Sequence, residues 1–247
     1  MDDRRPTDPC LSGAGLSPAR TRWRVALALV LLVPAPSVGV LSAMILQPGH
    51  PLSRVVFVLS KIWLFALPVV WLLVVERGRP SFSPLRRGGM LAGLLSGVVL
   101  SAGILAAYGL LGERMIPRDA FVAKLTAVGL ADWRAYLAGA LYWVLVNSVL
   151  EEYVWRWFCT EQFGRLMRPR AAIVASALCF TLHHALALHS YFPEAPIVTA
   201  ACSAGVFVGG VTWSALYVRT RSVWPGYFSH AIVDIAVFGL GAAMLFG

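Results

Sequence analysis

The chain has 247 residues, of which 58% are hydrophobic and 13% are charged, and its formal net charge is +9. A soluble domain carries roughly a quarter of its residues as charged types, so this composition excludes an ordinary soluble domain and favours a membrane protein. The basic residues are scattered over short loops and form no stripe interleaved with aromatic residues, so the positive charge does not predict nucleic-acid binding.

Apolar stretches follow a polar start. Residues 1–23 are polar and contain several Pro and Gly residues, and we expect them to form a disordered tail. The rest of the chain holds apolar runs of about 20 residues, the length that a helix needs to cross a bilayer. The predicted fold class is therefore all-α, a polytopic membrane bundle of about seven helices, with eight as the alternative count. The seven predicted spans are residues 24–46, 55–75, 89–112, 135–157, 172–190, 197–218 and 223–246.

The loops between these spans differ in charge. Arginines gather in the tail and in the loops after the second, fourth and sixth spans, whereas the first loop holds only Arg54 and the fifth holds no basic residue. Cytoplasmic loops carry an excess of Lys and Arg, so we expect a cytoplasmic N-terminus and an external C-terminus. Seven spans satisfy this parity and an eighth would break it. The strong preference for Arg over Lys indicates a GC-rich bacterium, and hence an inner or plasma membrane.

The third loop, residues 113–134, has mixed charge. Within it, DAFVAKLTAVGLADW (119–133) predicts a helix that lies at the membrane interface. We therefore divide the chain into a cytoplasmic tail (1–23), N-terminal membrane helices with the interfacial segment (24–134), and a C-terminal membrane core (135–247).

Several ionisable residues lie inside the predicted spans. A charge at mid-bilayer costs about 2.5–3.5 kcal/mol on insertion scales, so such residues need a reason to be there. Most of them fall in the fourth, fifth and seventh spans. Lys61, by contrast, lies near the outer end of its predicted span, and we expect it to extend towards the headgroups. The full set is Lys61, Glu151, Glu152, Arg156, His183, His184, His189, His230 and Asp234.

Helix geometry assigns different roles to the two adjacent glutamates. Residues four apart share a helix face, so Glu152 can pair with Arg156. Glu151 points about 100° away from Glu152 and is left to face the bundle interior, with Asn147 one turn before it. This placement suits Glu151 to act as a general acid or base.

The same four-residue spacing recurs twice. Phe180 and His184 share a face in FTLHH, and His230 and Asp234 share one in HAIVD. A carboxylate one turn from an imidazole can fix the tautomer and orientation of the ring. His183 lies about 100° from His184 on the helix, and we expect it to support the site by packing or hydrogen bonding.

Together, EEYVWR (151–156), FTLHH (180–184) and HAIVD (230–234) resemble the EExxxR, FxxxH and HxxxN/D motifs of the CAAX-protease and bacteriocin-processing family. The resemblance covers roughly residues 135–240 and implies an intramembrane endopeptidase of the glutamic type. It implies that Glu151 activates a water that His184 helps to hold, and that His230 lies near the developing oxyanion. Asp234 stands where many relatives have Asn. It would either donate a hydrogen bond in its protonated form or orient His230. The supporting residues would be Glu152, Arg156, Phe180, Asn147 and His183.

The sequence leaves two questions open. The first is metal dependence: we expect no cofactor, and the alternative is a Zn²⁺ ion held by Glu151, His184 and His230. The second is function itself, because a non-proteolytic scaffold or bacteriocin-immunity protein, or a small proton-coupled transporter, would also place such residues in a membrane. The expected partners are membrane lipid and a hydrophobic or membrane-anchored peptide. A prenylated tail is one option, although such tails are not expected in a GC-rich bacterium, and a sorting signal or a bacteriocin leader is as plausible. The sequence contains no HExxH, GxSG or GxGD motif, which argues against the corresponding protease types.

Overall fold

The computed structural model describes residues 18–79, 83 and 89–247, and the described residues contain helices and no strands. Most of the predicted tail falls outside them. The first helix begins at Pro18, six residues before the predicted start of the first span. The N-terminal half consists of α1 (Pro18–Leu32), α2 (Pro34–Val40), η2 (Leu41–Leu46), α3 (Pro51–Val70), η3 (Trp71–Glu76), α4 (Gly89–Ala107), η4 (Tyr108–Gly112), α5 (Glu113–Met115) and α6 (Arg118–Ala127), where η marks a π-helical segment.

The C-terminal half begins with one continuous helical run over residues 133–164. It is followed by three long helices, two of which start with a proline, the residue whose fixed backbone angle suits the first helical position. The elements are α7 (Trp133–Tyr142), η5 (Trp143–Asn147), α8 (Ser148–Glu151), η6 (Glu152–Thr160), α9 (Glu161–Gly164), α10 (Pro169–Tyr191), α11 (Pro196–Thr220) and α12 (Trp224–Phe246).

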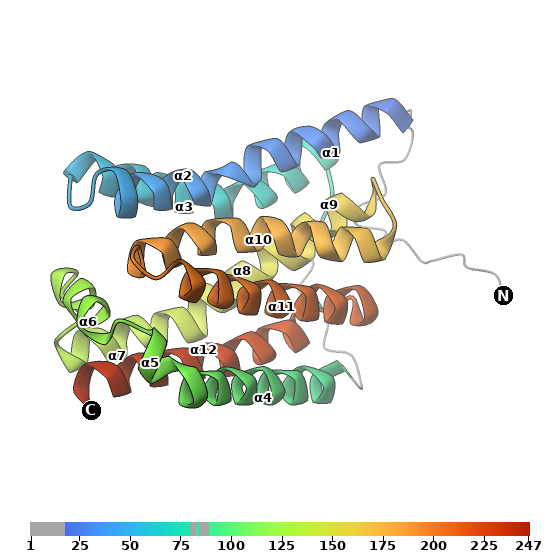
Figure 1. Cartoon of the computed structure of the whole chain (residues 1–247). Coiled ribbons are helices and arrows are strands. Elements are labelled where there is room, and N and C mark those ends of the chain that lie inside the picture. The colour runs from blue at the N-terminus through green and yellow to red at the C-terminus, as the bar shows by residue number, and fades with distance from the viewer. Residues whose placement is uncertain (1–17, 80–82, 84–88) are drawn as a thin grey trace.

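The helices form a layered bundle (Figure 1). Helices α1, α2 and α3 lie together on one side, α10 and α11 occupy the centre, and α4 and α12 lie on the opposite side. The run from α7 to α9 crosses the bundle behind the central pair and contacts α3, α10, α11 and α12. Its residues Val154 and Trp155 are fully buried in a core cluster that also contains Leu64 of α3 and Phe180 of α10.

Small residues allow α4 to approach α12 closely. A Cβ atom added at Gly93 would meet the backbone of Pro225, and one added at Gly97 would meet the backbone of Ser229. One turn further along, the Ser101 hydroxyl donates to the carbonyl of Ile232 over 3.2 Å. Close approach of small residues is a common way to pack helices in lipid, and it fixes the wall of the bundle that carries His230 and Asp234.

The membrane prediction is confirmed. Within the described residues, six helices are long and apolar enough to cross a bilayer: Ala19–Leu46, Pro51–Glu76, Gly89–Gly112, Pro169–Tyr191, Pro196–Thr220 and Trp224–Phe246. They correspond to six of the seven predicted spans, and residues 133–164 supply the remaining long helix, which carries the charged residues of the first motif. The chain is an integral membrane protein with an all-α fold.

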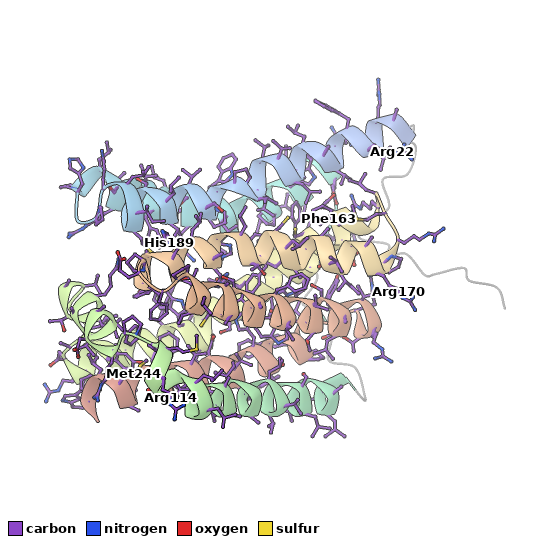
Figure 2. The ribbon with its side chains drawn as sticks, in the orientation of Figure 1. Arg22, Arg114, Phe163, Arg170, His189 and Met244 are labelled. Carbon is purple, nitrogen blue, oxygen red and sulfur yellow. The ribbon has the colours of Figure 1, made fainter. Side chains whose placement is uncertain are left out.

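The two ends of the bundle differ. Figure 2 shows Arg22, Phe163 and Arg170 at the end where α1 begins, and His189, Arg114 and Met244 towards the other end. At that second end the short helix α6, within the segment predicted to be interfacial, caps two longer helices. Lys124 donates to the Ser190 carbonyl over 2.7 Å, and Arg118 Nε donates to the Met244 carbonyl over 3.0 Å.

Candidate active site

Three segments bring the sequence motifs together: the junction of α8 and η6, the middle of α10, and the first three turns of α12. Glu151 is the last residue of α8, and Glu152 opens the π-helical segment η6. π-Helical segments inside longer helices frequently occur at functional sites. Here the segment contains Glu152 and Arg156, and it joins directly onto Glu151.

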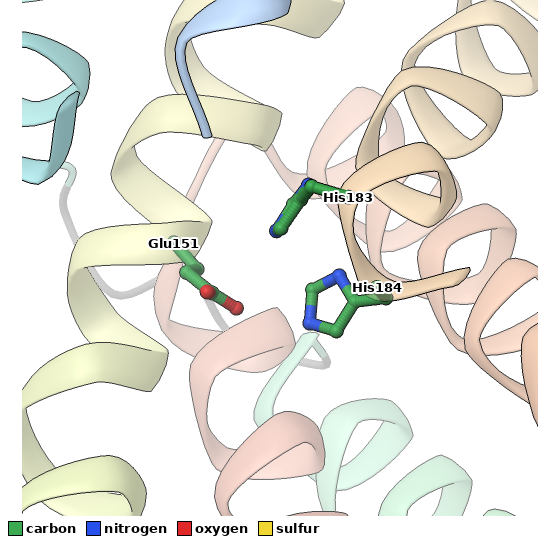
Figure 3. A group of neighbouring side chains, drawn as sticks. All are labelled: Glu151, His183 and His184. Carbon is green, nitrogen blue, oxygen red and sulfur yellow. The ribbon is translucent and has the colours of Figure 1, made fainter. Parts of the chain in front are cut away.

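Glu151 faces two histidines of α10 (Figure 3). One ligand atom from each of Glu151, His183 and His184 lies within 4.8 Å of the others. Glu151 is 3% exposed and His183 is 5% exposed. The interior position expected for Glu151 is therefore what the structure shows, and the carboxylate lies in a site that bulk water barely reaches.

The FTLHH motif fixes the orientation of His184. Its Nδ1 lies 2.9 Å from the carbonyl oxygen of Phe180, one turn earlier on the helix. Because a carbonyl oxygen only accepts hydrogen bonds, Nδ1 carries the proton, and Nε2 of the neutral ring keeps its lone pair. The spacing of Phe180 and His184 thus leaves Nε2 as an acceptor or a metal ligand beside Glu151.

Glu152 connects the first motif to the third. Its Oε1 lies 3.2 Å from Arg156 Nε, which confirms the predicted i, i+4 pair, and both side chains are fully buried. The same oxygen lies 3.2 Å from Nδ1 of His230. A second guanidinium nitrogen, Nη1 of Arg156, donates to Ser214 over 3.2 Å. Glu152 is therefore more than the partner of Arg156, because it also holds His230.

The other nitrogen of His230 faces two carboxylates. Nε2 lies 3.9 Å from Glu151 Oε2 and 3.8 Å from Asp234 Oδ1. Asp234 shares a face with His230 as predicted, but these separations exceed hydrogen-bond length. The short contact of Asp234 is with Ser148, whose hydroxyl lies 2.6 Å from Oδ2. Asp234 thus connects the third motif to the helix that carries Glu151.

Aromatic rings fill the space around these groups. The Phe180 ring packs against His184, with centroids 4.4 Å apart, and the Arg156 guanidinium carbon lies 4.6 Å from the Phe180 centroid. Trp213 stacks on His230, with centroids 3.9 Å apart and planes inclined by 15°. Trp155 stacks on His183 in a similar way. Tight aromatic packing fixes ring orientations and keeps water from the ion pairs.

The structure thus brings all four predicted catalytic side chains, Glu151, His184, His230 and Asp234, into one cluster. Of the supporting residues, Glu152, Arg156, Phe180 and His183 contact this cluster, as the preceding distances show. Asn147 is buried in η5, one turn before Glu151.

The group with metal-ligand spacing differs from the predicted set. It consists of Glu151, His183 and His184, whereas the expected third ligand was His230. His183 and His184 are adjacent in the sequence, yet both imidazoles reach Glu151 because long side chains from one helix turn can converge on a facing residue. The Nδ1 atom of His230, by contrast, is occupied by Glu152. The three side chains offer a donor set that suits Zn²⁺.

Sequence reasoning missed three residues of the site. Ser148 contacts Asp234, and Trp213 stacks on His230. Both contacts arise from tertiary packing, which no spacing rule predicts. Lys61 of α3 was expected at the outer headgroups. It instead lies close enough to Glu151, His183 and His184 to interact electrostatically with all three.

Comparison with protein families agrees with this geometry. Residues 133–236 match the family model described as type II CAAX prenyl endopeptidase Rce1-like. The match begins at the first residue of α7 and ends just after Asp234, so it contains all three motifs and leaves the first three spans outside. The comparisons with curated proteins and with solved structures found no match. Residues 133–236 are therefore similar to the Rce1-like CAAX endopeptidase family, the family that the three motifs resemble.

Proposed function

We propose that this protein is an intramembrane endopeptidase that hydrolyses a peptide bond in a hydrophobic or membrane-anchored substrate, with Glu151 as the general base. The observation that carries the proposal is the placement of Glu151 opposite the free Nε2 of His184, inside the segment that matches a protease family. Two acceptors that face each other can hold one water by both of its hydrogens.

Each step of the reaction has a group to perform it. Glu151 takes a proton from the water, and the oxygen attacks the carbonyl carbon of the scissile bond to form a tetrahedral oxyanion. As the C–N bond breaks, Glu151 returns the proton to the leaving amine. Water is consumed, and a new carboxyl group and a new amine are formed.

His230 is placed to stabilise the oxyanion. Its Nδ1 is held by Glu152, so its Nε2 can donate a hydrogen bond only when the ring is protonated. The carboxylates of Glu151, Glu152 and Asp234 surround the ring and compensate such a positive charge. Stabilisation by preorganised donors in a site with little water is commonly the largest single contribution to catalysis.

The orientation in the membrane follows from the loops. Arg22 and Arg170 lie at one end of the bundle (Figure 2), and Arg165 and Arg168 precede Arg170 in the short connection from α9 to α10. We assign this end to the cytoplasm of a bacterial cell because cytoplasmic loops are enriched in basic residues. The C-terminus then lies outside.

The test compares membranes from cells that express the wild-type protein, Glu151→Gln or Glu194→Gln. Glu194 is an exposed acid outside the site and serves as the matched control. New peptide termini are mapped by mass spectrometry. Termini that appear with the wild type and with Glu194→Gln, and disappear with Glu151→Gln, are the expected result. If the three membranes give the same termini although all three proteins are folded and inserted, the protease function is wrong, and a scaffold or a transporter becomes the better hypothesis.

A further inference from the structure

Lys61 lies on the face of α3 that points into the bundle. It precedes Leu64, Pro68 and Trp71 by three, seven and ten residues, and this spacing places all four on one helix face. Leu64, Pro68 and Trp71 are all buried, and Leu64 and Trp71 belong to the same core cluster as Val154 and Trp155. Lys61 is one turn before Leu64, and Glu151 is one turn before Trp155. Helix α3 contacts η6, which begins directly after Glu151, and the lysine is close enough to Glu151 for the two charges to interact.

The charge of Lys61 is not neutralised by a close partner. Among the described side chains, no carboxylate lies within 4 Å of its ammonium group, whereas Arg156 is paired with Glu152. The ammonium lies 5.7 Å from the centroid of the Phe65 ring, and it interacts at longer range with Glu151 and the histidines. A cation inside a membrane helix is costly and commonly marks a functional site.

The depth of Lys61 in the membrane limits which anionic groups can reach its ammonium group. Lys61 is ten residues from Pro51, the first residue of α3, which corresponds to about 15 Å along the helix. A lipid phosphate stays near the headgroups, so it would have to leave the interface to reach the ammonium. The backbone of a hydrophobic peptide is neutral except at its ends. A peptide that enters the site with its C-terminus therefore carries one carboxylate to this depth.

We propose that Lys61 binds the C-terminal carboxylate of the substrate and so directs cleavage to a bond near the end of the substrate chain. The inference rests on the proposed function and adds a specificity-determining residue on α3, outside the segment that matches the family model. A charge-assisted hydrogen bond to a carboxylate is among the strong ones in proteins, and its loss lowers the reaction rate by about tenfold or more.

The test uses the full-length protein in phosphatidylcholine vesicles and two synthetic peptides. Both contain an S-farnesylated cysteine followed by three apolar residues, and one ends in a free carboxylate while the other ends in a carboxamide. Cleavage is followed by mass spectrometry for the wild type, Lys61→Met, Lys61→Arg and Arg54→Met. Arg54 lies on the exposed face of the same helix, so Arg54→Met controls for the loss of a cation from α3.

The wild type and Arg54→Met should cleave the free acid about tenfold faster than the amide or more. Lys61→Met should lose this preference by slowing on the acid alone, and Lys61→Arg should retain part of it. Equal cleavage of the two peptides by the wild type would overturn the inference and leave the proposed function intact. Equal slowing of Lys61→Met on both peptides would also overturn it, because Lys61 would then serve Glu151 and not the substrate.

Two further outcomes complete the test. Repeating it in vesicles with phosphatidylglycerol separates the lipid phosphate from the peptide carboxylate. An effect of Lys61→Met that follows the anionic lipid content, and not the peptide terminus, contradicts the inference. If the wild type cleaves neither peptide, the endopeptidase function on prenylated substrates fails, and the role of Lys61 fails with it.

Discussion

Glu152 Oε1 lies 3.2 Å from Nδ1 of His230, and both side chains are buried. This contact joins the second glutamate of the first motif to the histidine of the third, across two helices that are far apart in the sequence. It assigns a positioning role to Glu152, because the bond to Nδ1 sets which nitrogen of His230 faces Glu151 and Asp234. The two adjacent glutamates thus differ in function: one faces the reacting water, and the other orients a ring.

The buried pair of Glu152 and Arg156 should matter strongly for stability. Glu152→Gln leaves the guanidinium uncompensated at 0% exposure, and breaking a buried pair by removing one partner costs about 3–5 kcal/mol. Arg156→Met should cost a similar amount, since it leaves the carboxylate without its cation. We expect the double variant Glu152→Gln/Arg156→Met to be more stable than the sum of the single effects predicts. Thermal unfolding of all four proteins in detergent measures this coupling.

A part-buried ion pair outside the site provides the control for this cycle. Arg165 and Glu76 pair over 2.7 Å, with side chains that are 22% and 10% exposed. The matching cycle Glu76→Gln/Arg165→Met should give a smaller coupling, because water reaches this pair and screens it, and fully exposed pairs contribute about 1 kcal/mol or less. Equal coupling energies in the two cycles would show that burial does not strengthen the pair of Glu152 and Arg156.

Gly226 should be intolerant of a side chain. A Cβ atom there would collide with Oε2 of Glu152, whereas a Cβ at Gly239 of the same helix meets no atom within 4 Å. Gly226→Ala should therefore displace Glu152 and lower both activity and stability. Gly239→Ala should be neutral or stabilise by about 0.5–1 kcal/mol, the usual benefit of Ala over Gly inside a helix. Peptide cleavage and unfolding temperature measured on both variants check the contrast, and a fully active Gly226→Ala would mean that the position of Glu152 is not critical.

Local patterns were enough to predict the spans and the ion pair of Glu152 with Arg156 within one helix. The seven spans follow from the length of the apolar runs, and the contact of Glu152 with Arg156 follows from the i, i+4 rule. The resemblance to a protease family supplied the roles of the site residues. The contact of Glu152 with His230 could not be predicted, because the rotation of one helix against another depends on packing and not on spacing.

Lys61 shows how a small error in a helix boundary changes an interpretation. The second span was predicted to begin at residue 55, which put Lys61 near the outer end, but α3 begins at Pro51 and places the lysine about 6 Å deeper. The side to which Lys61 points could not be predicted either. The burial of Leu64 and Trp71 shows which face of α3 is turned towards the bundle. Sequence periodicity alone left that face undetermined.

Asp234 should tolerate replacement by Asn. The amide oxygen of Asn can accept the hydrogen bond that Ser148 now donates over 2.6 Å, and its NH₂ group can donate to an oxyanion. We expect Asp234→Asn to keep activity within about tenfold of the wild type and Asp234→Leu to lose 100-fold or more, the scale on which an oxyanion donor is lost. Rates of peptide cleavage decide this prediction. If Asp234→Asn is as inactive as Asp234→Leu, the reaction requires the negative charge of Asp234 beside His230.

Metal dependence can be decided with the two adjacent histidines of α10. We expect cleavage to persist after treatment with EDTA or 1,10-phenanthroline, because Glu151 and His184 can hold and activate water without an ion. His183→Phe should then remain active, since a ring of similar shape can still stack on Trp155, while His184→Phe should be inactive because it removes the acceptor Nε2. A zinc site formed by Glu151, His183 and His184 gives a different pattern. Both variants would lose activity, chelation would abolish cleavage, and added Zn²⁺ would restore it only in the wild type.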